Sequence, residues 1–219
     1  MGDDGAGKPA MARDPQLPTH WFNILHDRPQ YVTSAVSRSR LAGPVKAAGQ
    51  GALLQQPLSL ARQSINTADR YIPIPHEVLD LYAQYRPTPL RRAVHLEERL
   101  GANARIYYKY EGANLTGSHK LNTALAQAYY YAQAGVKHLV TGTAAGQWGT
   151  ALAYACQVMN LDCTVFMVRS TLRQKPIRGE MMRLFGAVVY ESPSDLTEVG
   201  RRAFKTDPEG IGTLAVATG

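Results

Sequence analysis

The sequence predicts an α/β fold, in which a parallel sheet carries helices on its faces. Three observations lead to this prediction. From residue 86 onward, short runs rich in branched and aromatic residues alternate with longer amphipathic runs. Glycines follow the ends of the amphipathic runs, where helices commonly stop. The chain has 219 residues, 45% hydrophobic and 19% charged, which is enough to bury a substantial core.

The chain divides into three regions by composition. Residues 1–16 are rich in Gly, Asp, Pro and Lys, so we expect a mobile leader. Residues 17–85 scatter apolar side chains among Pro, Gly, Ser and Gln, which indicates an irregular N-terminal arm. Within this arm, apolar residues at helical spacing predict a short helix over 76–84. Residues 86–219 form the α/β region.

The elements of the α/β region follow from the periodicity. Residues 86–90 cannot be helical, because each of the two prolines biases its predecessor toward extended geometry. A helix over 91–100 is closed by Gly101. We expect the strands at 105–110, 137–141, 163–168 and 187–190, and the further helices at 119–134, 150–159 and 173–185. Ligands of such sheets bind at the carboxyl ends of the strands, so the loops that follow the strands are the candidate sites.

Charge and cysteine content exclude several classes of protein. The formal net charge is +7, but no basic run is long enough to favour nucleic acid. No stretch approaches the roughly 18 apolar residues of a membrane span, so we expect no membrane contact. Cys156 and Cys163 lie in apolar stretches without metal-ligand spacing, which predicts buried, reduced thiols and no metal site. These features favour a cytoplasmic protein.

The loop 111–118 precedes a lysine with an unusual position. Lys120 falls in the first turn of the helix over 119–134. The positive end of the helix dipole disfavours an ammonium there, and a neutral amine is the form that makes a Schiff base. Ser118 can cap the helix, and the ring of His119 is suited to stacking on a flat cofactor. From residue types alone, a solvated surface lysine after a capped turn remains an alternative.

The loop 143–149 also joins a strand to a helix. Its small residues let a ligand approach the backbone, and the N–H groups of the turn can bind an anion such as a carboxylate. Thr143 and Gln147 add side-chain hydrogen bonds. A tight turn packed for reasons of fold is the alternative.

Two other groups of residues favour structural roles. The basic stretch 169–178 is interpreted as a solvated helix start rather than an anion site. The tyrosines at 107, 108, 110 and 129–131 are expected in core and edge packing rather than around a cofactor.

Several runs together carry a resemblance to a known family. The sequence resembles the tryptophan synthase β chain of the divergent second type, a family of fold-type-II pyridoxal-phosphate enzymes, over nearly all of residues 17–219. The matching runs are Leu17–Leu25, Arg86–Leu90, Tyr107–Gly112, Thr116–Lys120, Ala145–Gly149, Gln174–Pro176 and Ser192–Glu198.

The resemblance implies a role for each residue of the two loops. Lys120 is implied to be the Schiff-base lysine for pyridoxal 5'-phosphate and to move protons at the substrate's Cα. His119 is implied to stack on this cofactor, and Asn122 to contact it. The residues implied to bind the carboxylate of an amino-acid substrate are Thr143, Ala144, Ala145, Gly146, Gln147 and Trp148.

Two departures from the family pattern change the expected activity. Gly142 stands where the family has a glutamate that assists loss of the serine hydroxyl, and Ala144 replaces a glycine. A general acid–base group contributes about two to four powers of ten in rate. We therefore expect aldol-type chemistry or replacement of a better leaving group at Cα and Cβ.

The family also continues well past residue 219, with the loop that binds the cofactor phosphate and the group that faces the pyridine nitrogen. The chain is then either a fragment or one half of a split enzyme. We expect a heteromer with a second chain that supplies the C-terminal half. Conventional synthesis of tryptophan from serine and indole remains one alternative, and a non-catalytic subunit that retains the fold is another.

Overall fold

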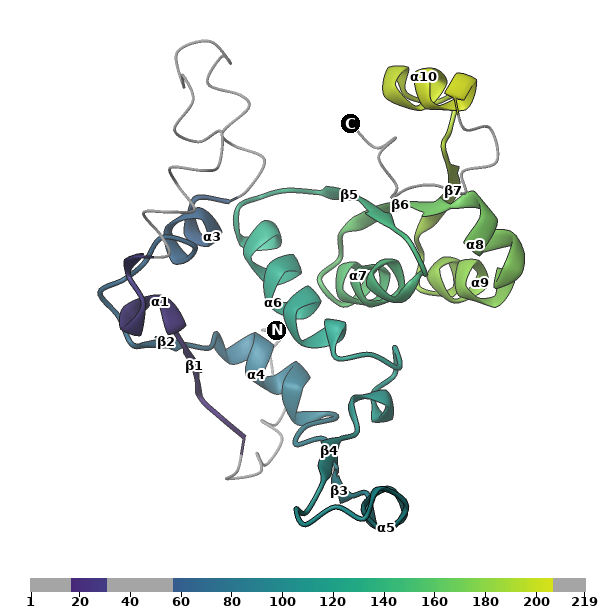
Figure 1. Cartoon of the computed structure of the whole chain (residues 1–219). Coiled ribbons are helices and arrows are strands. Elements are labelled where there is room, and N and C mark those ends of the chain that lie inside the picture. The colour runs from purple at the N-terminus through teal and green to yellow at the C-terminus, as the bar shows by residue number, and fades with distance from the viewer. Residues whose placement is uncertain (1–16, 31–56, 207–219) are drawn as a thin grey trace, which may run out of the picture.

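The computed structural model describes residues 17–30 and 57–206. The expected leader 1–16 and much of the arm, 31–56, lie outside these ranges. Within them, the chain forms a three-stranded parallel sheet with helices beside it, a group of short N-terminal elements, and a hairpin that extends away from both (Figure 1).

The parallel sheet has the strand order β5 (His138–Thr143), β6 (Asp162–Val168) and β7 (Val188–Ser192). Helix α7 (Gln147–Val158) connects β5 to β6, and helices α8 (Arg169–Gln174) and α9 (Pro176–Leu184) connect β6 to β7. In Figure 1 these three helices lie together below the strands. The predicted parallel sheet with flanking helices is confirmed for this part of the chain.

The core lies between the sheet and α7. Alternate residues of β6 (Cys163, Val165, Met167) are buried, and α7 meets them through Gly149, beside Val165, and Cys156, beside Cys163. Cys156 and Cys163 are free and buried, as predicted. Because α7 carries small residues on this face, its backbone comes close to the strands.

Helix α6 (Lys120–Gln133) packs against α7 on one side and against α4 (His76–Ala83) on another. The helix predicted at 76–84 is thereby confirmed, with Val78, Leu79 and Tyr82 buried. The described part of the N-terminal arm contains four further short elements. Strand β1 (His20–Phe22) pairs antiparallel with β2 (Tyr71–Pro73), and α1 (Ile24–Asp27) and α3 (Leu58–Gln63) lie nearby.

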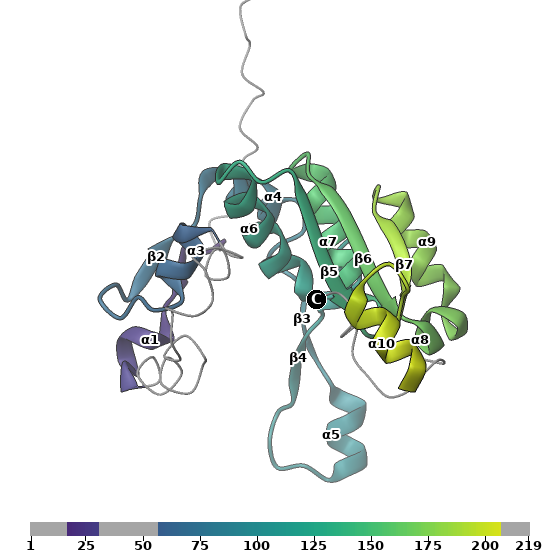
Figure 2. The same cartoon turned by 90° about the horizontal axis from the view of Figure 1, so that it is seen from above.

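The strand predicted at 105–110 does not join the parallel sheet. Strand β4 (Tyr107–Lys109) pairs antiparallel with β3 (Leu90–Arg92), and α5 (Val94–Leu100) fills the connection between them. Figure 2 shows this hairpin extending from the body of the molecule. The prediction that this strand joins the parallel sheet was wrong, because the alternation of strands and helices along the sequence does not give the direction of a strand. The helix predicted from residue 91 begins three residues later, at Val94. Gly101, with φ 58°, ends α5 as predicted.

Two further expectations need correction. The tyrosines of the hairpin are exposed rather than packed, with 50% of Tyr107 and 48% of Tyr108 accessible. The helix predicted over 173–185 is divided at Lys175, because Pro176 occupies the first position of α9. Helix α10 (Glu198–Thr206) was not anticipated.

Arg169 is also not part of a solvated helix start. Only 8% of it is exposed, its Nε donates to Glu191 Oε2 at 2.6 Å, and its guanidinium lies 4.3 Å from the ring centre of Phe204. This ion pair ties the start of α8 to β7, and the contact with Phe204 ties it to α10. In the described ranges, each helix is too short or too polar to cross a membrane.

Replacing Gly149 by alanine should destabilise the fold. A Cβ at this position would lie 2.6 Å from Met182 Sδ, 2.8 Å from Val165 Cγ1 and 2.9 Å from Thr143 Cγ2. Overpacking of a core typically costs about 1–3 kcal/mol, so the free energy of unfolding in urea should fall by that amount. Gly112→Ala is the matched control, because the atoms it would meet belong to the exposed ring of Tyr110. Equal stability of the Gly149 variant and the wild type would contradict this packing.

Candidate active site

Asn114 organises the loop that precedes α6. Only 6% of this residue is exposed, and its Nδ2 donates to the backbone oxygens of Glu111 and Ser118 at 2.9 and 2.8 Å. Its Oδ1 accepts the N–H and the hydroxyl of Thr116, both at 3.0 Å. One buried side chain thus replaces the backbone hydrogen bonds that the loop lacks. The sequence analysis did not identify this residue, although Asn favours such turns.

Lys120 is the first residue of α6, as the sequence predicted. His119 occupies the position before the helix with helical dihedral angles and no side-chain cap, while Ser118 Oγ accepts the Lys120 N–H at 3.3 Å. Ser118 therefore caps the helix. The Lys120 side chain is half-buried, and no acceptor or carboxylate of the described residues engages its Nζ. The ring of His119 is exposed beside it.

The loop between β5 and α7 comprises Ala144, Ala145 and Gly146. Gly146 has φ 87°, and a Cβ there would lie 3.0 Å from Cβ of Arg178. Both the left-handed backbone conformation and the lack of space therefore favour glycine at this position. Thr143 is buried, and its Oγ1 accepts the N–H of Gly149 at 3.2 Å. Trp148 Nε1 donates to Thr141 Oγ1 at 2.9 Å. Thr143 and Trp148 are thus used to hold the turn.

The backbone of this turn is suited to an anion. The N–H groups of Ala145, Gly146, Gln147 and Trp148 meet no acceptor within the described ranges. The first N–H groups of a helix commonly bind carboxylate or phosphate, since they combine free donors with the positive end of the dipole.

Lys120 and this turn lie at the same end of the sheet. Helices α6 and α7 precede and follow β5, so both run antiparallel to it, and they pack against each other. Both helices therefore begin near the carboxyl end of β5, as Figure 2 shows. The predicted lysine and the predicted carboxylate loop are brought together by this topology.

Gly142 lies in β5, where its backbone is paired with Phe166 of β6. The side chains of a strand alternate between faces. Thr143 faces α7, so position 142 faces the opposite side of the sheet, together with Val140. The resemblance implies a glutamate at this position, and this chain has glycine there.

Asn122 is held by side chains that the sequence analysis did not identify. Tyr85 Oη donates to Asn122 Oδ1 at 2.9 Å, and Asn122 Nδ2 lies 3.4 Å from Glu111 Oε2. Glu111 Oε1 in turn accepts the hydroxyl of Thr88 at 2.6 Å. These partners come from two segments, residues 85–88 and the loop at Glu111, that are distant from Asn122 in sequence, so no local sequence pattern could have indicated them.

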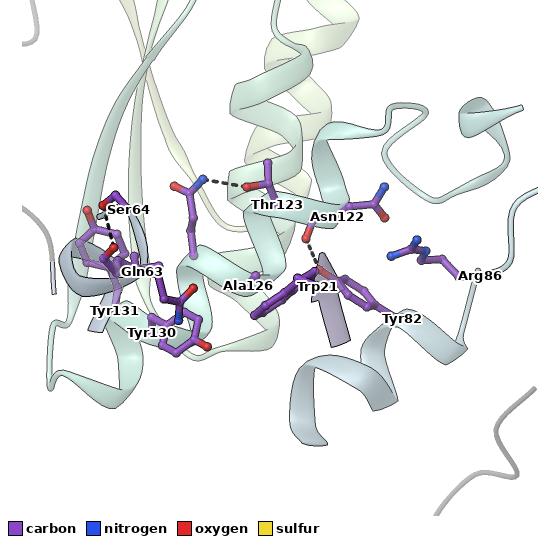
Figure 3. Close-up of a pocket in the computed structure, with 12 residues that line it drawn as sticks. Trp21, Gln63, Ser64, Tyr82, Arg86, Asn122, Thr123, Ala126, Tyr130 and Tyr131 are labelled. Atoms are coloured by element: carbon purple, nitrogen blue, oxygen red, sulfur yellow. Dashed lines mark hydrogen bonds between the residues drawn. The ribbon is translucent and has the colours of Figure 1, made fainter. Parts of the chain in front are cut away.

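A cavity of about 590 Å³ runs along the exposed side of α6. In Figure 3, Arg86, Tyr82 and Asn122 lie at one end, Ser64 and Tyr131 lie at the other, and Trp21 lies between them. Its lining residues are Trp21, Leu60, Gln63, Ser64, Tyr82, Arg86, Asn122, Thr123, Ala126, Gln127, Tyr130 and Tyr131. Asn122 is the one predicted site residue in this lining. Lys120 and the turn after β5 lie outside it.

A lysine and a turn of free N–H groups at the carboxyl edge of a parallel sheet place this chain in the class of α/β proteins whose ligand sites lie at that edge. The comparison with protein families gives the class its chemistry. Residues 81–215 match the family model described as "Pyridoxal-phosphate dependent enzyme". The chain belongs to this family.

Curated relatives are similar over almost the whole chain. Tryptophan synthase beta chain 2 of Thermococcus kodakarensis is 46% identical over 95% of this chain, and that of Thermotoga maritima is 48% identical over 92%. The alignments cover 46% and 47% of those proteins, so the chain spans about half the length of these relatives. A crystal structure of a pyridoxal 5'-phosphate-dependent aspartate racemase aligns with 62% of the chain and 45% of the racemase, at a TM-score of 0.46 and 21% identity.

The described residues fit the cofactor of the family at its reactive end. Lys120 offers an amine without an ion-pair partner in the described ranges, and the helix starts beside it offer free N–H groups. Asn122 offers an amide whose hydrogen bonds to Tyr85 and Glu111 leave one N–H.

Asn114→Ala should loosen the loop before Lys120. The substitution leaves buried backbone groups without partners, at a cost of about 1–3 kcal/mol for each group. The melting temperature should fall, and limited proteolysis should cut within 111–118. Asn103→Ala is the control, since Asn103 is exposed. An unchanged proteolysis pattern would show that Asn114 does not hold the loop.

Proposed function

We propose that this chain supplies the lysine-bearing half of a pyridoxal-phosphate enzyme that acts at Cα and Cβ of an amino acid. One observation carries the proposal. Lys120 begins α6 beside the start of α7, within the residues that match the family. An unpaired amine next to a turn of free N–H groups is the combination that such chemistry needs.

Each residue of the site has a task in this proposal. Lys120 holds the cofactor covalently and carries a proton to or from the substrate's Cα. The turn from Thr143 to Trp148 binds and orients the substrate carboxylate, and the exposed ring of His119 covers one side of the cofactor. When bound, pyridoxal phosphate supplies an electron sink that makes bonds at Cα labile.

The residue at position 142 favours a particular reaction type. A glycine cannot protonate a departing hydroxyl. Glu111, the carboxylate beside Asn122, already accepts hydrogen bonds from Thr88 and Asn122. We therefore favour aldol-type chemistry, or β-substitution of a group that leaves without acid assistance. Conventional tryptophan synthesis is the second candidate, and the relatives named for it support this alternative.

We also propose that a further polypeptide segment, corresponding to the rest of the relatives' length, completes the site. Two surfaces support this. The face of the sheet opposite α7 carries accessible apolar side chains, with Val140 54% and Val188 50% exposed. The hairpin β3–β4 is two-stranded, and such a hairpin is marginally stable alone. A segment packed against both would bury apolar area that now meets water.

The register of the hairpin leaves its outer edges available. The Tyr110 N–H donates to Pro89 O, and the Ala93 N–H donates to Ile106 O, both at 2.8 Å. Because alternate residues of an antiparallel pair bond inward, the residues between them direct their backbone groups outward. These residues are Leu90 and Arg92 of β3 and Tyr107 and Lys109 of β4. Strands of the complementary segment can pair there, and a second chain is the form that we favour.

Reduction with borohydride should fix pyridoxal phosphate to Lys120. The full chain is mixed with the cofactor, reduced and digested, and mass spectrometry then locates the added mass. We expect it on Lys120 and expect Lys120→Ala to lose both this adduct and the covalent absorbance. Lys137→Ala is the control, since Lys137 is an exposed lysine outside the candidate site. Equal labelling of several lysines, with no loss in Lys120→Ala, would favour a non-catalytic subunit.

The activity with serine and indole should depend on position 142. The chain is combined with the C-terminal half of a curated relative, and tryptophan is measured. Gly142→Glu should form tryptophan about 10²–10⁴ times faster than the wild type, because it restores an acid. Gly142→Gln, of similar size, should not. A wild-type rate that equals the Gly142→Glu rate would establish conventional synthesis despite the glycine.

A further inference from the structure

Two tyrosines from the end of α4 contact the first turn of α6. Tyr82 is 1% exposed, and its Oη donates to the backbone oxygen of Asn122 at 2.5 Å. Tyr85 lies beside it, with the two ring centres 6.3 Å apart and the planes at 83°. Its Oη donates to Asn122 Oδ1 at 2.9 Å. The backbone and the side chain of Asn122 are therefore held by separate hydroxyl groups.

The opposite side of the Asn122 amide faces a carboxylate. Glu111 Oε2 lies 3.4 Å from Asn122 Nδ2, and Glu111 is itself fixed by the hydroxyl of Thr88, which is 4% exposed. If the amide were flipped, its oxygen would face the carboxylate, and two acceptors would repel each other. The hydroxyl of Tyr85 and the carboxylate of Glu111 together select one orientation of the amide.

This orientation fixes what Asn122 can offer to a ligand. Its oxygen accepts the hydroxyl of Tyr85 on one of two lone pairs, and Glu111 uses at most one of the two N–H groups of Nδ2. The remaining N–H group is a donor. Burial, with a smaller contribution from Tyr82, raises the pKa of Tyr85 above its usual range, so this hydroxyl stays protonated at neutral pH. The polarity of Asn122 thus does not change across the neutral range.

We propose that Tyr85 is a positioning residue, which acts through Asn122 to present an N–H donor to an acceptor atom of the bound cofactor. This inference rests on the proposed function, in which Lys120 holds the cofactor, and on the cofactor contact that the resemblance implies for Asn122. Tyr85 touches neither the cofactor nor the substrate in this scheme. It restricts Asn122, so that the donor is already oriented when the cofactor binds.

A first measurement tests the positioning without any cofactor. In the full chain labelled with nitrogen-15, the side-chain amide protons of Asn122 should exchange slowly with solvent. Tyr85→Phe should accelerate this exchange, because Oδ1 loses its donor and the amide can rotate. Tyr82→Phe is the matched control, since its hydroxyl contacts the backbone oxygen of Asn122 and not the side-chain amide. Equal exchange rates in Tyr85→Phe and the wild type would overturn the inference.

A second measurement connects the positioning to the cofactor. Titration of the chain with pyridoxal phosphate, followed by absorbance, should give a dissociation constant roughly three- to tenfold higher for Tyr85→Phe, as expected for one lost hydrogen bond. The absorbance maximum of the bound cofactor should also shift, and Tyr82→Phe should leave it in place. In an Asn122→Ala background, Tyr85→Phe should have no further effect on the dissociation constant.

The outcomes separate the two proposals. If the wild-type chain attaches the cofactor at Lys120 but Tyr85→Phe weakens binding equally with and without Asn122, Tyr85 acts by another route and the inference is wrong. If the wild-type chain does not attach the cofactor at Lys120, the proposed function fails, and the cofactor role of Tyr85 fails with it. The exchange measurement then shows whether Tyr85 orients Asn122 for structural reasons alone.

Discussion

The close approach of α7 to the sheet is the constraint on which the remaining structure depends. At Gly149 there is no room for a Cβ between Met182, Val165 and Thr143. This contact sets the distance between α7 and the strands β5 and β6, and α6 in turn packs against α7. The positions of the two helix starts, with Lys120 at one and the turn after β5 at the other, depend on this contact. A core contact thus determines the geometry of a site at the edge of the sheet.

The parts of the fold that depend on local pattern were predictable from the sequence. Strands β5 to β7, the start of α6 at Lys120 and the end of α5 at Gly101 follow from periodicity and glycine placement. The hairpin was mistaken for part of the parallel sheet, because a run of branched and aromatic residues does not encode its partner. The break at Lys175 was visible in the sequence, since Pro176 favours the first position of a new helix.

In the candidate site, too, the features that follow from local sequence pattern were predictable, and those that depend on tertiary contacts were not. Lys120 and the turn after β5 were found because each combines residue type with position in a recognisable run. Asn114, Tyr85 and Glu111 were missed, since their roles arise from contacts among α4, the loop and α6 that only the folded chain creates. The buried Arg169 was misjudged for a related reason, because its partners Glu191 and Phe204 lie far along the chain.

The charge of the hairpin has a consequence for solubility. Three of the six residues in β3 and β4 are cationic (Arg91, Arg92 and Lys109), and none is acidic. Two copies that approached edge to edge would bring like charges together, which discourages the aggregation that open strand edges otherwise promote. An incoming strand with acidic side chains would meet attraction instead. The same residues therefore disfavour self-association of the free chain and favour an edge-pairing strand that carries acidic side chains.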